Sequence, residues 1–184
     1  GMGTVAVDAE DDGDLDLFVT HLRDETNTFY QNLGGRFRDH TGALGLAAPS
    51  LPFTGFGVGF QDFDRDGVLD LYVANGAVTR NRTPYDASDP YGEPDQLFRG
   101  QRATDGTLRY TELLPRGGTE APLLGNGRGA AFGDLDEDGD VDVVVVDNGQ
   151  RVKLLENVAP GGHWISLRLR ERGGGDALGA RATL

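Results

Sequence analysis

Cysteine is missing from this 184-residue chain, and the other residues that usually build catalytic or zinc sites are scarce. Without cysteine there is no disulfide, no thiol nucleophile and no thiolate metal ligand. Only three histidines occur, at His21, His40 and His163, and we interpret each as a surface or packing residue. The G-x-S-x-G motif of serine hydrolases is absent as well. The sequence therefore predicts no catalytic residue, and it makes zinc and copper poor candidates.

Long hydrophobic runs and an excess of positive charge are also lacking. The run VVVV at 143–146 is the longest of its kind and is far too short to cross a bilayer, and no signal peptide is visible. The formal net charge is −13. Such a charge repels nucleic acids and anionic lipid surfaces. We therefore expect no nucleic-acid partner and no membrane insertion.

One acidic motif is present three times. Residues 3–19, 57–73 and 129–145 each begin with small or apolar residues and end in an apolar run. Between these lie acids at relative positions 1, 3, 5 and 9 and a glycine at position 6. The nine-residue loops 8–16, 62–70 and 134–142 contain 16 of the 30 acidic residues, so the acidity is local. A repeat of this size is typical of a solenoid, a propeller or an array.

The spacing of these acids favours a hard cation. Alternate carboxylates on a tight loop direct several oxygens to one centre, and Ca²⁺ accepts roughly six to eight of them, whereas Mg²⁺ demands a strict octahedron and keeps its waters. Position 7 includes Val68, which has no side-chain ligand, so this position most simply contributes its backbone carbonyl. We predict about three Ca²⁺ ions. The candidate metal residues are Asp8, Glu10, Asp12, Asp14 and Asp16; Asp62, Asp64, Asp66, Val68 and Asp70; and Asp134, Asp136, Asp138, Asp140 and Asp142.

Two alternatives compete with this interpretation. An EF-hand needs a bidentate glutamate at position 12 and a helix on each side. Here position 12 is Val19, Val73 or Val145, each inside a run that reads as a strand, which argues against an EF-hand. The other alternative is three solvated acidic turns that bind nothing, and the agreement of three copies in register weighs against it.

The strand pattern predicts an all-β fold of four-stranded antiparallel β-propeller blades. An apolar strand follows each loop, at 15–20, 69–74 and 141–146, with apolar residues on both faces, as expected when sheets stack. Third strands are predicted at 27–32, 95–100 and 151–157, and fourth strands at 35–41 and 106–113. No long helix is expected. This gives about three blades in residues 1–160, which form an incomplete propeller because closed ones typically have four to eight.

Two segments stand outside the blades. Residues 79–95, with three prolines, interrupt the second unit, and we interpret them as an ordered excursion packed on the propeller rim, with a ligand-binding loop as the alternative. The composition changes in the sequence APGG at 159–162, and the tail 161–184 carries a net charge of +2. Residues 163–171 alternate and predict a strand, and ARATL predicts the start of another. The tail thus reads as the start of a small β domain.

These motifs resemble a known family. The DxDxDGxxD loops, which follow the dipeptides GF or AF, are similar to FG-GAP/VCBS repeats, which build integrin-α-like calcium-binding β-propellers. The tail GHWISLRLRERGGGDALGARATL resembles the N-terminal part of an ASPIC/UnbV domain. The order of repeats, then LLGNGRGAAFGDLDEDGD, then this tail, resembles the cartilage acidic protein/UnbV family. Glu10 departs from the aspartate that is usual at position 3.

The resemblance implies an extracellular, cell-surface or periplasmic protein whose Ca²⁺-stabilised propeller serves recognition or adhesion of a protein or glycan. Because some bacterial relatives belong to natural-product (enediyne) pathways, an enzyme or accessory protein of such a pathway is the alternative. A calcium-dependent spacer is a third possibility that the sequence does not separate from the first. Three blades also leave two sheets uncovered, so we expect further blades of a longer parent chain, or self-association, to complete the ring.

Overall fold

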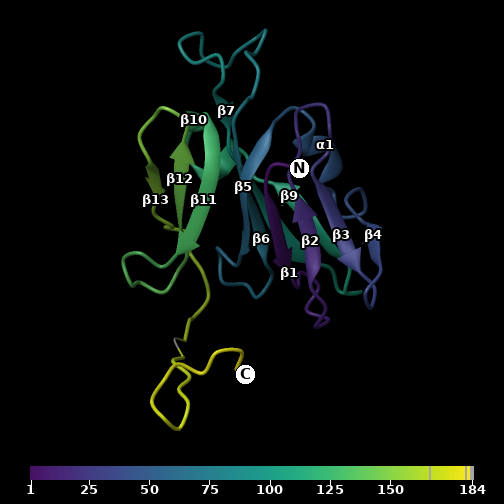
Figure 1. The fold of residues 1–184 in the computed structure, drawn as a ribbon, viewed down its shortest axis with the longest axis vertical. Coiled ribbons are helices and arrows are strands. Elements are labelled where there is room, and N and C mark those ends of the chain that lie inside the picture. Colours follow the sequence, from purple (N-terminus) through teal and green to yellow (C-terminus); the bar gives the residue numbers. More distant parts are fainter. Residues whose placement is uncertain (166, 181, 183–184) are drawn as a thin grey trace.

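Three antiparallel sheets stand side by side in the computed structural model, which describes residues 1–165, 167–180 and 182 (Figure 1). We name them blades 1, 2 and 3 in chain order. Blade 1 consists of β1 (Thr4–Val7), β2 (Asp16–Val19), β3 (Thr28–Asn32) and β4 (Phe37–Asp39). Blade 2 consists of β5 (Gly55–Gln61), β6 (Asp70–Asn75), β8 (Gln96–Arg102) and β9 (Leu108–Glu112). Blade 3 consists of β11 (Gly127–Gly133), β12 (Asp142–Asp147) and β13 (Lys153–Leu155).

The remaining elements are short. β7 (Glu93–Pro94) pairs with β10 (Leu124–Gly125) and links blades 2 and 3. The helices are a single α-turn, α1 (Ala47–Ser50), and the 3₁₀ turn η1 (Arg116–Gly118). No helix among the described residues is long and apolar enough to cross a membrane. The prediction of an all-β fold built from four-stranded antiparallel blades is confirmed.

Most predicted strands are confirmed to within a few residues at their ends. The three strands that follow the acidic loops each begin one residue later than expected, at the aspartate of position 9. The tail differs from the prediction. Its described residues contain turns and one isolated bridge, Arg170 with Asp176, instead of the strand expected over 163–171. Of the strand start predicted in ARATL, only residues 180 and 182 lie within the described residues, and neither belongs to a strand.

The core lies between the blades, and the central strand β6 of blade 2 is buried on both faces. Between blades 1 and 2, the rings of Phe18 and Phe29 pack edge-on against Phe60, with centroids 5.6 and 6.3 Å away. Between blades 2 and 3, Tyr72 packs edge-on against Phe132 at 6.2 Å. Edge-to-face packing is a favourable geometry for aromatic pairs. The prediction that apolar residues cover both faces is thus confirmed for the central blade.

Buried ion pairs join the blades at the end away from the acidic loops. Lys153, the only lysine in the chain, lies 3.3 Å from Asp95 and 3.2 Å from Asp147. Tyr72 donates a hydrogen bond to the same Asp95 carboxylate. Burial raises the pKa of Asp95, and the Lys153 ammonium opposes that rise. Because this lysine comes from blade 3 and Asp95 from blade 2, the pair fixes the position of one blade against the other.

The interrupting segment 79–95 stands out at the upper end of the molecule in Figure 1, opposite the acidic loops. It consists of turns, an isolated bridge between Asp86 and Asp89, and strand β7. Tyr85 stacks on Phe53 at 6.4 Å, and Gln150 donates a hydrogen bond of 2.6 Å to Asp89. The segment is therefore anchored to blade 3 and to the connection between blades 1 and 2, as the interpretation of an ordered excursion predicts.

Candidate metal centre

The three acidic loops connect the first two strands of their blades and lie together at the lower end in Figure 1. We name them loop 1 (8–16), loop 2 (62–70) and loop 3 (134–142). In loop 1, the carboxylate of Asp8 accepts hydrogen bonds from the backbone N–H groups of Asp12 (3.0 Å) and Gly13 (2.9 Å). Loops 2 and 3 repeat the same two bonds at 2.9–3.1 Å. The position-1 aspartate thus holds each loop in a closed turn.

The aspartate at position 9 ties each loop to its blade. The carboxylate of Asp142 is buried and accepts N–H bonds from Leu135 in its own loop and Asn157 after β13, both at 2.9 Å. Asp16 and Asp70 make the equivalent pairs of bonds. These carboxylates satisfy backbone donors that burial would otherwise leave unpaired. Their role as metal ligands stays a prediction.

A left-handed backbone at position 4 is a feature that sequence reasoning missed. Asp11, Arg65 and Glu137 have φ of 60°, 56° and 65°, and the glycines at position 6 have φ of 86–93°. The glycines were expected, since only glycine adopts such φ values without strain. Position 4 carries no comparable signal, because its three residues share neither size nor charge. All three loops therefore adopt one backbone conformation although their side chains differ.

Loops 2 and 3 gather their carboxylates, and loop 1 does not. Asp62, Asp64 and Asp66 bring one oxygen each within 4.8 Å of one another, and so do Asp134, Asp136 and Asp138. These are the only two such groups of acidic, histidine or cysteine side chains in the part of the chain that the structure describes. The predicted residues at positions 1, 3 and 5 are therefore brought together in two of the three loops.

Glu10 explains why loop 1 differs. Its side chain is one methylene longer than aspartate, and its Oε1 accepts a hydrogen bond of 2.8 Å from Gln31 of β3. Burial raises the pKa of Glu10 to about 7, and the neighbouring carboxylate of Asp16 adds to the rise. The contact with Gln31 holds Oε1 at the sheet, and the carboxylates of Asp8, Glu10 and Asp12 are not among the groups of described residues that meet within 4.8 Å.

The residues present fit an oxygen-binding cation. Glu10 Oε2 in loop 1, Asp64 Oδ1 in loop 2 and Asp140 Oδ1 in loop 3 are buried and have no hydrogen-bond partner among the described residues. Buried acceptors without a partner are rare in proteins, and a bound ion commonly accounts for them. Desolvation raises the pKa of Asp140, as does the adjacent charge of Asp138. A divalent cation would satisfy the unpaired oxygens and relieve this repulsion. The donor set is all oxygen, which suits Ca²⁺ better than softer metals.

Two arginines already neutralise part of the negative charge of loops 2 and 3. Arg99 of β8 lies 2.5 Å from Asp64 and 3.5 Å from Asp66, directly on loop 2. Arg65 of loop 2 lies 4.0 Å from Asp140 of loop 3. Neither contact could be predicted from a local sequence pattern, because both join segments that are distant along the chain. Loop 2 thus carries an arginine at short range, whereas loop 3 has a longer ion-pair contact.

A strap formed by residues 157–165 crosses loops 2 and 3. Asn157 donates a hydrogen bond of 2.8 Å to the carbonyl of Phe63, and Arg65 donates one of 3.5 Å to the carbonyl of Ala159. Further along, the ring of Trp164 covers Gly139 so closely that a Cβ added there would clash with the indole. The predicted boundary at 159–162 therefore falls within a segment that packs on the acidic loops.

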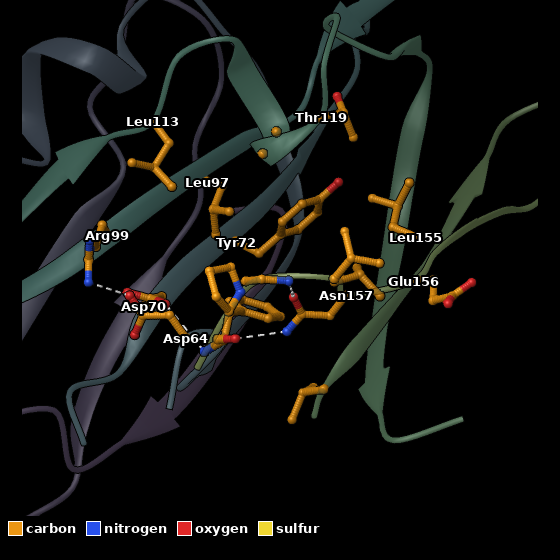
Figure 2. Close-up of a pocket in the computed structure, with 18 residues that line it drawn as sticks. Asp64, Asp70, Tyr72, Leu97, Arg99, Leu113, Thr119, Leu155, Glu156 and Asn157 are labelled. Atoms are coloured by element: carbon orange, nitrogen blue, oxygen red, sulfur yellow. Dashed lines mark hydrogen bonds and ion pairs between the residues drawn. The ribbon is translucent and has the colours of Figure 1, made fainter. Parts of the chain in front are cut away.

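A cavity of about 430 Å³ opens between blades 2 and 3 next to loop 2 (Figure 2). Apolar side chains such as Leu97, Leu113 and Leu155 form most of its wall. Its polar edge includes Asp64 and Arg99, which are paired with each other. Sequence reasoning missed this cavity, since its walls come from two blades and the strap. Most of its polar groups already form hydrogen bonds or ion pairs. The cavity therefore offers mainly apolar space next to the charged loop 2.

Comparisons with known proteins agree with this architecture. A search among curated proteins found no match. The FG-GAP-like repeat family matches residues 8–73, which run from the first residue of loop 1 to the strand after loop 2. The finer resemblance to the ASPIC/UnbV family stays a prediction. The repeated loop, the stacked four-stranded sheets and this match together assign an FG-GAP-like repeat to residues 8–73.

Proposed function

We propose that the chain is a calcium-binding β-propeller module for extracellular recognition or adhesion, in which Ca²⁺ has a structural role. The observation that carries the proposal is the pair of carboxylate groups in loops 2 and 3, each built on the same hydrogen-bonded turn. Asp62, Asp64 and Asp66 would hold one ion, and Asp134, Asp136 and Asp138 another. Bound Ca²⁺ would supply positive charge to carboxylates that otherwise repel one another.

Loop 1 is the third and weaker site in this proposal. Its backbone matches the other loops, but Gln31 holds Oε1 of Glu10 and the loop does not gather three carboxylates within 4.8 Å, so side chains must move before an ion is bound there. We therefore expect two tight ions and one that binds at least about tenfold more weakly, which is a difference of about 1.4 kcal/mol. This keeps the predicted total of about three ions and ranks them by loop.

Recognition would take place at the end opposite the metal loops. The strap covers part of the metal end, whereas the anchored segment 79–95 projects from the other end (Figure 1). Long ordered loops on a rigid scaffold commonly carry binding residues. The partner would be a protein or glycan, and the extracellular location rests on the typical setting of FG-GAP repeats. An enzyme or accessory protein of natural-product biosynthesis stays the alternative prediction.

Thermal unfolding tests the structural role of the metal. The protein is melted in EDTA, then with Ca²⁺ and, in a separate series, with Mg²⁺. We expect a large rise in the midpoint that is specific to Ca²⁺, because saturation at 100 times Kd adds about 2.7 kcal/mol per site to the stability of the folded state. An unchanged midpoint, or an equal rise with Mg²⁺, would contradict the proposal.

A further inference from the structure

The strap begins at a residue whose counterpart in blade 1 makes a different contact. Asn157 and Asn32 stand at the end of the third strand of their blades, and each donates its backbone N–H to the position-9 aspartate of its own loop. The side chain of Asn32 donates to the carbonyl of Leu15 in loop 1, at 3.1 Å and within the same blade. The side chain of Asn157 donates instead to Phe63 in loop 2, on the neighbouring blade. The strap is therefore tied to the loop of another blade from its first residue.

Two glycines continue this close packing on loop 2. An added Cβ on Gly161 would clash with the carbonyl oxygen of Asp64 and with the guanidinium of Arg65. An added Cβ on Gly162 would clash with the carbonyl oxygen of Arg65. The backbone of the strap therefore lies directly on positions 3 and 4 of loop 2, at a distance that the absence of a side chain permits.

The same strap reaches loop 3 with Trp164. Its indole covers Gly139, the glycine at position 6 of loop 3. The glycines at the same position of loops 1 and 2, Gly13 and Gly67, have no atom of the described residues within 4 Å of an added Cβ. Between the strap and loop 1, the described residues form neither a hydrogen bond nor a close glycine contact. The strap thus spans loops 2 and 3 and leaves loop 1 outside.

Arg65 joins the two loops and the strap. It lies inside loop 2, between two carboxylates of the group that meets there. Its guanidinium lies 4.0 Å from Asp140 of loop 3 and donates a hydrogen bond of 3.5 Å to the carbonyl of Ala159 in the strap. At the same two positions of loops 1 and 2 stand Asp11 and Val68, which cannot form an ion pair. This link is therefore a feature of loops 2 and 3.

We infer that loops 2 and 3 and the strap form one unit, in which an ion in either loop favours docking of the strap and the docked strap raises the affinity of both loops for the ion. The strap packs on closed turns, and without a cation the carboxylates of these turns repel one another. An effect of the ion on the strap requires an equal effect of the strap on the ion, because binding free energies are reciprocally linked. Loop 1 binds its ion outside this unit. The inference rests on the proposed metal function and adds a means of regulating it.

Limited proteolysis with chymotrypsin, with the cuts located by mass spectrometry, tests the effect of the ion on the strap. Trp164 in the strap and Tyr85 in the segment 79–95, at the opposite end, are both 53% exposed. We expect Ca²⁺ to slow the cut after Trp164 roughly fivefold or more, relative to EDTA, and to leave the cut after Tyr85 nearly unchanged. A rate at Trp164 that stays the same, or that falls only as much as the rate at Tyr85, would overturn the inference.

Isothermal titration tests the effect of the strap on the ions. Asn157→Ala and Gly161→Val should each release the strap, so the two tight ions should bind roughly fivefold more weakly, while the weak ion of loop 1 is unaffected. Asn32→Ala changes the matching residue of blade 1 and provides one control. Gly173→Val provides the other, since that glycine lies in the tail with nothing within 4 Å of an added Cβ. Both controls should keep the affinity of the two tight ions.

The inference and the metal function fail in different ways. A parent chain that binds no Ca²⁺ would overturn the metal function and the inference with it. Tight ions that keep their affinity in both strap variants would overturn the inference alone. Denaturant unfolding in EDTA checks that the variants fold. If Gly161→Val does not fold, Asn157→Ala decides, because it removes a side-chain bond and keeps the backbone bond to Asp142.

Discussion

Loops 1 and 3 share a backbone and differ in what their side chains do with it. Both have left-handed residues at positions 4 and 6, and both hold their turn with the position-1 aspartate. In loop 3, three carboxylates meet within 4.8 Å. In loop 1, one extra methylene at Glu10 turns a carboxylate to Gln31. The turn and the metal site are therefore separable: some acids build the loop, and others remain available for an ion.

The largest expected effect comes from an acid that builds the loop. Asp142→Ala removes the acceptor of two backbone N–H groups that burial leaves without water. We expect a loss of about 2–4 kcal/mol in the free energy of unfolding, both in EDTA and in Ca²⁺, measured by denaturant unfolding. A loss seen only with Ca²⁺ would mean that this aspartate acts chiefly as a ligand, and the separation of roles would fail.

Glu10→Asp tests whether one methylene accounts for the difference between the loops. Because loop 1 has the backbone of loop 3, the shorter carboxylate should join Asp8 and Asp12. Isothermal titration should then show three ions of similar affinity, where the parent chain shows two tight ions and one weak ion. At 100 times Kd the added tight site contributes about 2.7 kcal/mol of stability. Three equal sites in the parent chain would show that Glu10 is no obstacle.

Asp136→Asn provides the converse change, at position 3 of loop 3. Its carboxylate accepts only a long bond of 3.3 Å from the backbone of Asp138, so the turn should survive its loss. We expect Ca²⁺ affinity at this loop to fall by about tenfold, or 1.4 kcal/mol. Stability in EDTA should stay nearly unchanged. Glu10→Gln is the control at the same position of loop 1, and its effect on the two tight ions should be negligible.

The smallest effect concerns the arginine on loop 2. Arg99→Gln removes a cation that lies 2.5 Å from Asp64 and competes with a metal for the same oxygens. Calcium affinity at loop 2 should rise a few-fold, and the gain should shrink as salt increases, because exposed charges are screened. Arg109→Gln, on β9 of the same blade, has no ion pair among the described residues and provides the control. Weaker binding in Arg99→Gln would mean that the arginine orders the loop instead of opposing the ion.

Much of this could be predicted from the sequence, because its strongest signals are local and repeated. Spacing within nine residues identified the loops, and alternation located the strands on both sides of them. The difference between loops 1 and 3 depends on Gln31, which reaches Glu10 from another strand. The arginine contacts and the strap likewise join residues far apart in the chain. The described residues of 163–171 do not form the expected strand, since alternation alone does not supply a neighbouring strand for pairing.

The position of Trp164 gives the protein an optical property. It is the only tryptophan in the chain, and its ring lies on Gly139, one residue from Asp138 of the loop 3 carboxylate group. The indole therefore lies directly beside the predicted ion of loop 3. Its emission should report the filling of that loop without any label, while calorimetry counts all the ions together. Following one calcium titration by both fluorescence and calorimetry shows when loop 3 fills relative to the other loops.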